Sequence, residues 1–182
     1  MSDSAQSMPL VPPPSVEYGV FYRHEDSPGF FFRVLIAIID FIAVVAIAVG
    51  LGYLLEILLP ANSVRIIAGS ILLMCWTYEV PLKRSRLGTL GYLLFRVRIV
   101  DLHGRQPGLF RMSVRTLVSC AFNPIIDLIW LTSDDSRQGL RDKLCGTYIV
   151  RRSAVPAGQG ELVYVNVFFV GMNLIYREVR RN

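Results

Sequence analysis

The chain has 182 residues, a length that suits one domain with tails. Its hydrophobic content is 53%, and its charged content of 18% is below the roughly 25% that is usual in soluble domains. These values and several long apolar runs exclude an ordinary soluble domain and indicate an integral membrane protein.

Residues 1–29 are expected to form an N-terminal tail. Serine, proline and acidic residues predominate in residues 1–17, which predicts disorder. Residues 18–32 are rich in aromatic side chains and are typical of a lead-in at the membrane interface, where His24 is interpreted as solvated surface. Because the tail lacks the basic start of a signal peptide, we expect no cleavage, and the first span should act as an uncleaved anchor.

The first apolar run, Phe32–Leu55, is long enough to cross a bilayer as one helix, which needs roughly 20 residues. It carries Arg33 at its start and a carboxylate, Asp40, well inside. These two side chains are close to two helical turns apart, roughly 10 Å along the axis, and therefore share one face. A carboxylate at this depth costs about 2.5–3.5 kcal/mol, so this face should turn away from lipid.

A short connector, residues 56–63, predicts a turn between two antiparallel helices. The second span is expected over Val64–Val80, and its Trp76 and Tyr78 mark the far interface. The next connector, Lys83–Arg115, contains eight basic residues and one acidic residue. The positive-inside rule places this basic connector, and with it the N-terminus, on the cytoplasmic side of the cell membrane.

The charge of the basic connector has two interpretations. Positive segments bind nucleic acid, but beside membrane spans they attract anionic lipid headgroups. We therefore expect the lipid bilayer as a partner, with other membrane proteins as further partners, and no nucleic acid.

Two segments of the cytoplasmic part have the pattern of strands. Phe95–Val100 alternates apolar residues with arginines, which is a period of two. Gly146–Val150 is also typical of a strand and could pair with it. This pairing would place residues 133–152 on the cytoplasmic side.

The third apolar run, Leu109–Leu131, is interrupted by Asn123 and Pro124. A proline there removes a backbone donor and clashes with the preceding turn. The run is therefore either a kinked full crossing or a re-entrant pair of half-helices, and the basic segment after it favours re-entry.

The C-terminal part, residues 153–182, has two interpretations. Leu162–Tyr176 is apolar but short for a span, and Asn166 and Asn173 would share one helix face, which predicts an interfacial helix. The β-rich start of the segment, Leu162–Val170, equally predicts a hairpin with the preceding strand.

We therefore predict an all-α multi-pass membrane protein. It has a transmembrane helical hairpin, a third broken or re-entrant apolar segment, and a small basic cytoplasmic cap that could contain short strands. Its parts are a disordered or interfacial tail over residues 1–29, a membrane domain over residues 30–152, and a C-terminal strand or interfacial helix over residues 153–182.

Three stretches follow one another between about Phe30 and Arg152: FFRVLIAIIDFI, LGTLGYLLFRVRIVDLHG and RQGLRDKLCGTYIVRR. Together they resemble the RDD family of small membrane proteins, which is named for one arginine and two aspartates. The resemblance implies that the family arginine falls on Arg33 and the aspartates on Asp40 and Asp142. Arg115 stands where the family often has an arginine that opens its third apolar run.

The sequence departs from the family pattern at two places. Leu90 and Tyr92 replace a proline and a lysine of the family's turn, and Arg141 replaces a histidine of its closing block. A role that needs a titrating imidazole at that position is therefore not expected. The resemblance implies an architecture more firmly than an activity, since the family suggests only transport of unidentified ligands.

The two family aspartates each have a functional and a structural interpretation. Asp40 would bind a proton or a cation, or it would lock helices together through an ion pair or hydrogen bond. The candidate partners of Asp40 are Arg33, Arg65, Arg115 and polar groups of the second span. Asp142 is expected to hold the closing block against the basic connector. The candidate partners of Asp142 are Arg115, Arg137 and Arg141.

The sequence contains no nucleophile with a suitable base, no phosphate-binding glycine loop with its lysine, and no cluster with metal-ligand spacing. We therefore expect no enzymatic activity, no cofactor and no metal, and no disulfide among Cys75, Cys120 and Cys145. The first hypothesis is a transport-related protein in which Asp40 binds a proton or cation. The second is a non-transporting scaffold that binds other membrane proteins.

Overall fold

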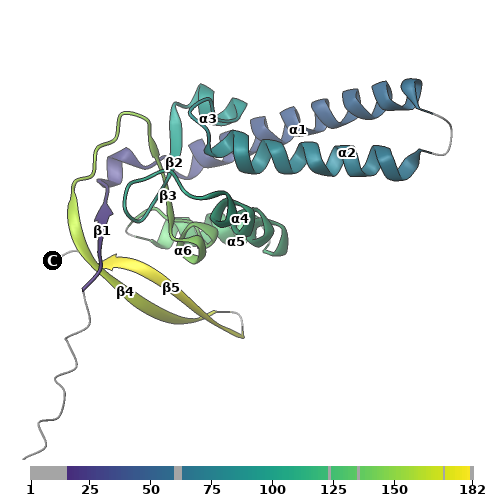
Figure 1. Cartoon of the computed structure of the whole chain (residues 1–182). Coiled ribbons are helices and arrows are strands. Elements are labelled where there is room, and N and C mark those ends of the chain that lie inside the picture. The colour runs from purple at the N-terminus through teal and green to yellow at the C-terminus, as the bar shows by residue number, and fades with distance from the viewer. Residues whose placement is uncertain (1–15, 60–62, 123, 135, 170, 181–182) are drawn as a thin grey trace, which may run out of the picture.

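The structure is a computed structural model that describes residues 16–59, 63–122, 124–134, 136–169 and 171–180. The disorder predicted for the tail falls mainly on residues 1–15, which lie outside the described part. Figure 1 shows two parts, a long helical hairpin and, at its base, a cap of short helices and two sheets.

The helical hairpin consists of α1 (Phe30–Leu58) and α2 (Val64–Thr77), which run side by side (Figure 1). A π-helical turn, η2 (Tyr78–Leu82), extends α2 and contains Pro81, which cannot donate a backbone hydrogen bond. Both helices, with the residues that extend them, are long and apolar enough to cross a membrane. The predicted pair of candidate spans is therefore confirmed.

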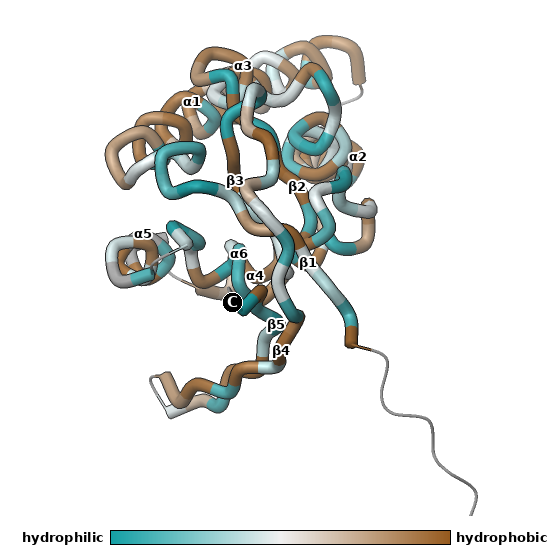
Figure 2. Tube along the Cα trace, turned by 90° about the vertical axis from the view of Figure 1, so that its left-hand side faces the viewer, coloured by the Kyte–Doolittle hydropathy of each residue, from teal (hydrophilic) through white to brown (hydrophobic). Residues whose placement is uncertain are grey.

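The surface of this hairpin is apolar. Phe41 of α1 is 70% exposed, and Leu72 of α2 is 72% exposed. Figure 2 shows that hydrophobic residues predominate along α1, whereas hydrophilic residues gather in the connections of the cap. An apolar surface of this extent marks a region that another apolar phase covers, and a bilayer fits the length of the helices.

A small sheet joins the cap to the helical hairpin. Its strands, β2 (Val97–Asp101) and β3 (Thr147–Arg151), are antiparallel, with Ile99 opposite Ile149. The predicted pairing of these two segments is confirmed. Both isoleucines are buried in one hydrophobic cluster with Ile36 of α1, so the cap and the first long helix share a core.

The third apolar run forms two short helices, α4 (Leu109–Ala121) and α5 (Pro124–Ser133), so the predicted break is confirmed. At 1.5 Å per residue α4 is about 20 Å long, shorter than the roughly 30 Å of a bilayer core. Re-entry of this run remains a prediction. Two further short helices complete the cap, α3 (Leu90–Leu94) and α6 (Leu140–Cys145).

A second sheet corrects the all-α prediction. It has the order β1-β4-β5, with β1 (Tyr18–Phe21), β4 (Gly158–Phe169) and β5 (Met172–Arg180). The predicted interfacial helix over Leu162–Tyr176 is wrong, because its valines and aromatic residues form the β4–β5 hairpin. The predicted hairpin with the preceding strand is also wrong, because that strand, β3, pairs with β2, and the hairpin partner of β4 is the following strand, β5. On its other edge β4 pairs with β1, from the region interpreted as an interfacial lead-in.

Candidate functional site

Asp142 is the centre of a buried charge cluster. It lies in the first turn of α6, is fully buried, and caps this helix by accepting a hydrogen bond from the Gly139 amide at 3.3 Å. Arg33 Nη1, from the first turn of α1, donates to Asp142 Oδ2 at 2.5 Å. Arg115 Nη1, from α4, pairs with Asp142 Oδ1. Three helices that are distant in sequence therefore meet at one carboxylate.

Further hydrogen bonds fix both arginines of this charge cluster. Arg33 Nε donates to the Pro28 carbonyl at 3.3 Å, and its Nη2 donates to the Arg137 carbonyl. Arg115 donates to the hydroxyl of Thr147 in β3. A buried ion pair needs good geometry and additional hydrogen bonds to be stabilising. Arg33 meets both conditions, whereas Asp142 Oδ1 and Arg115 Nη2 contact each other's side chains only through charge and have no hydrogen-bond partner among the described residues.

The electrostatics of the charge cluster keep it charged. Burial alone would raise the pKa of Asp142, but Arg115 and Arg33 lower it to about 2. Burial alone would lower the pKa of Arg115, but the neighbouring Asp142 carboxylate raises it above its ordinary value. Asp142 is therefore ionised at neutral pH and is not poised to exchange protons there.

Asp40 has a different set of partners. It is buried in α1, and its Oδ1 accepts hydrogen bonds from the Tyr78 hydroxyl at 3.2 Å and the Gly91 amide at 2.8 Å. Its Oδ2 accepts a hydrogen bond from the Thr89 hydroxyl at 2.8 Å, and Lys83 Nζ lies 3.5 Å away. Asp40 thus fastens the start of α3 and the start of η2 to the first long helix.

The glycine of this contact allows α3 to approach α1 closely. A Cβ at Gly91 would lie 2.7 Å from the Ile36 carbonyl oxygen and 3.0 Å from Asp40 Oδ1. The first of these atoms belongs to the backbone of α1 and cannot turn aside. The LGTLGY stretch therefore needs a residue without a side chain at this position.

Arg33 and Asp40 share one face of α1, but they have different partners. Arg33, a candidate partner of Asp40, contacts Asp142 instead. Of the other candidates, a polar group at the end of the second span contacts Asp40, namely Tyr78. For Asp142, the expected ion pair with Arg115 is present.

The sequence did not predict three residues that contact the charged side chains of this region. Lys83 and Thr89 were not expected beside Asp40, and Asp127 was not expected beside Arg141, to which it is ion-paired at 3.1 Å. The hydroxyl and glycine of the LGTLGY turn are a usable signal for a carboxylate partner, since they offer two donors close together. Nothing in the sequence pattern around Asp127 indicates its partner.

A cavity of about 410 Å³ adjoins Asp40, between α1 and the cap. Part of its wall is apolar and comes from one face of α1, namely Ile36, Ala37, Phe41 and Val44. Six charged side chains also line it, namely Arg33, Asp40, Glu79, Lys83, Asp127 and Arg141. The cavity therefore combines an apolar wall with equal numbers of acidic and basic groups.

Lys83 occupies the position between two carboxylates of this cavity. Its Nζ lies 2.8 Å from Glu79 Oε2 and 3.5 Å from Asp40 Oδ2. The side chain of Lys83 is 13% exposed, so the ammonium is mostly shielded from solvent. A site that holds an ammonium between two carboxylates has the charge and the oxygen ligands to hold another cation of similar size.

Within the part of the chain that the structure describes, no group of three His, Cys, Asp or Glu side chains could hold a metal ion.

Comparison with known proteins identifies the family of this chain. No curated protein and no solved structure matches this chain. The family model described as RDD family matches residues 27–146, a range that contains Arg33, Asp40, Arg115 and Asp142. The match covers most of the chain, including both long apolar helices and the short helices α3 to α6 of the cap, while β1, β3, β4 and β5 lie outside it. The chain belongs to the RDD family.

Proposed function

We propose that this RDD family member is a multi-pass protein of the cytoplasmic membrane, with α1 and α2–η2 as its crossings. The basic connector Lys83–Arg115 begins where η2 ends, on the cap side of the hairpin. Because positive segments next to spans stay in the cytoplasm, the cap and the N-terminus lie on the cytoplasmic side.

We further propose a transport-related, non-enzymatic role in which the cavity beside Asp40 binds a proton or a monovalent cation. The observation that carries this proposal is the position of Lys83 between Glu79 and Asp40. The ammonium is 3.5 Å from Asp40, longer than a close ion pair, while Asp40 keeps its hydrogen bonds to α3 and η2. An entering cation would displace Lys83 toward solvent and take its place between the two carboxylates.

A test of this role uses the purified protein in sealed vesicles. We expect proton flux that depends on an imposed Na⁺ or K⁺ gradient and that is lost in the Asp40→Asn variant. The Asp26→Asn variant is the matched control, because Asp26 lies in the tail-proximal 3-10 turn His24–Asp26, away from the cavity lining. No flux in any ion gradient would reject transport.

The second candidate is a non-transporting scaffold that binds other membrane proteins. The observation in its favour is that both family aspartates already have partners within the chain. Asp142 is enclosed by two arginines, and Asp40 accepts three hydrogen bonds. Absence of flux, together with a stable partner that is captured by the wild type and lost when α1–α2 is altered, would favour this candidate.

A further inference from the structure

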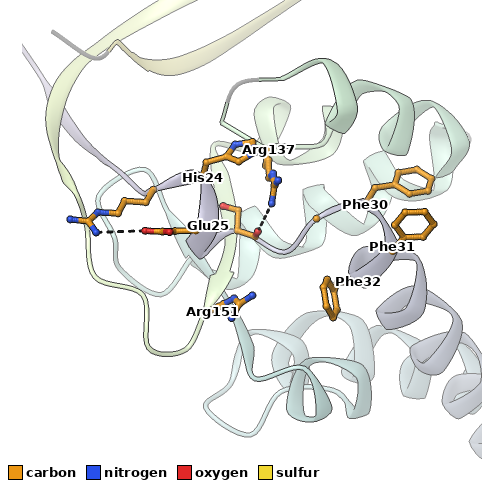
Figure 3. Close-up of a pocket in the computed structure, with 10 residues that line it drawn as sticks. His24, Glu25, Phe30, Phe31, Phe32, Arg137 and Arg151 are labelled. Carbon is orange, nitrogen blue, oxygen red and sulfur yellow. Dashed lines mark hydrogen bonds and ion pairs between the residues drawn. The ribbon is translucent and has the colours of Figure 1, made fainter.

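A second cavity, of about 760 Å³, lies where the N-terminal segment enters α1 (Figure 3). It is separate from the cavity beside Asp40, and the two share no lining residue. Its walls come from the 3-10 turn and the start of α1, from the loop before α6, and from the end of β3. None of the residues discussed for the proposed transport role lines it.

The charged lining of this cavity is mainly positive. It contains Arg23, Arg137 and Arg151 against one acid, Glu25. Arg23 Nη1 lies 3.6 Å from Glu25 Oε1, and both side chains are largely exposed, so these two charges offset each other. Arg137 and Arg151 supply the remaining positive charge, and Figure 3 shows them reaching the cavity from opposite sides.

The backbone of Arg137 is held in a fixed position. Its φ is +50°, a left-handed conformation that is uncommon for a residue with a side chain. Its carbonyl accepts a hydrogen bond from Arg33, and its Nη1 donates to the Ser27 carbonyl at 3.3 Å. The charge cluster therefore places the Arg137 guanidinium beside the start of α1, with further N–H groups available to a ligand.

The wall of the cavity that α1 supplies is aromatic. Phe30, Phe31 and Phe32 form the first turn of α1 and are 37%, 80% and 49% exposed. In Figure 3 these three rings lie on the α1 side of the arginines. The positively charged part of the cavity therefore lies next to exposed aromatic rings, at the point where the apolar helix α1 begins.

We propose that this cavity binds the phosphate group of an anionic phospholipid, with Arg137 and Arg151 on the phosphate and the phenylalanines against the acyl chains. Guanidinium groups bind phosphate oxygens through two parallel hydrogen bonds. The membrane is the favoured source of the phosphate, because the exposed phenylalanines would contact acyl chains and because α1 enters the bilayer here. That placement rests on the membrane part of the proposed function and not on transport.

The test measures lipid binding to the detergent-purified full chain by native mass spectrometry. Dioleoylphosphatidylglycerol is compared with dioleoylphosphatidylcholine, whose headgroup carries no net charge, and with glycerophosphoglycerol, the soluble headgroup without acyl chains. We expect tight retention of the anionic lipid, weakened about fivefold by Arg151→Gln and again by Arg137→Gln. The control is Arg180→Gln, which removes one exposed positive charge from β5, outside the lining.

Each outcome decides the proposal. Selective loss of phosphatidylglycerol in the Arg151→Gln and Arg137→Gln variants, with little effect of the soluble headgroup, supports a lipid site. Equal binding of the soluble headgroup at the same arginines supports the phosphate site but assigns it to a soluble phosphate ester. Equal loss in Arg180→Gln, or no preference over phosphatidylcholine, overturns the proposal. If Arg137→Gln lowers the melting temperature, its effect on lipid binding could come from unfolding, and the Arg151→Gln variant then tests the proposal. Arg151 is exposed at the end of β3, so its substitution should leave the fold intact.

Discussion

Arg33 and Asp142 are 109 positions apart in the sequence, and their side chains form a buried ion pair at 2.5 Å. The pair joins the first turn of the first long helix to the last short helix of the cap. Arg115 binds the other oxygen of the same carboxylate. The arginine and the second aspartate of the family pattern therefore act together, and the first aspartate, Asp40, holds a separate contact with α3.

Removing the charge of Asp142 should destabilise the protein strongly. The Asp142→Asn variant leaves two buried arginines without their counter-ion, and breaking a buried pair in this way costs about 3–5 kcal/mol. Denaturant unfolding in detergent, followed by circular dichroism, measures this loss. The Asp26→Asn control removes a half-buried carboxylate outside the charge cluster and should change the free energy of unfolding by less than about 1 kcal/mol.

The lowered pKa of Asp142 predicts that the protein loses stability in acid. Its pKa is lowered from 3.8 to about 2 in the folded protein, so the unfolded chain takes up the proton at the higher pH. The stabilisation is therefore complete above about pH 5 and is lost as the pH falls toward 2, by roughly 2 kcal/mol. The difference in unfolding free energy between wild type and Asp142→Asn should narrow over this range. A constant difference would argue against an ionised Asp142.

The contact between α3 and α1 predicts unequal effects of two glycine substitutions. Gly91→Ala would put a Cβ 2.7 Å from the Ile36 carbonyl, so α3 must move away from Asp40. Gly50→Ala in α1 meets nothing within 4 Å. We expect Gly91→Ala to lower the melting temperature and to speed amide hydrogen exchange in α3, while Gly50→Ala is neutral or slightly stabilising. Equal effects of both changes would contradict this contact.

The position of Lys83 predicts competition with an added cation. The Lys83→Met variant removes the ammonium from between Glu79 and Asp40 and leaves two carboxylates beside the cavity. We expect Na⁺ or K⁺ to raise the melting temperature of this variant more than that of the wild type, because the ion replaces the lost charge. The variant Lys83→Met with Asp40→Asn should lose this response. An equal response of wild type and Lys83→Met would speak against a cation site there.

Local patterns in the sequence predicted the parts of the fold that depend on neighbouring residues. The long apolar runs predicted α1 and α2, the alternation of arginines with apolar residues predicted β2, and Pro124 predicted the break between α4 and α5. Each of these patterns follows from periodicity or from the missing donor of proline.

Contacts between distant segments were harder to predict. The sheet β1-β4-β5 pairs Tyr18 with Glu161, and no local pattern announces a partner so far along the chain. The apolar, β-rich segment of β4 suited both an interfacial helix and a strand. The partner of Arg33 was missed for a similar reason, because helix geometry places Asp40 on the same face while the cap brings Asp142 closer.

If Arg33 and Asp142 hold the first long helix and the cap together as one pair, the contribution of each side chain to stability must depend on the other. A double-mutant cycle with Arg33→Gln and Asp142→Asn, followed by unfolding in detergent, tests it most directly. We predict that the double variant loses little more stability than Asp142→Asn alone, with a coupling of roughly 2 kcal/mol or more. Additive losses of the two single variants would contradict this coupling, since they would mean that the two side chains act independently.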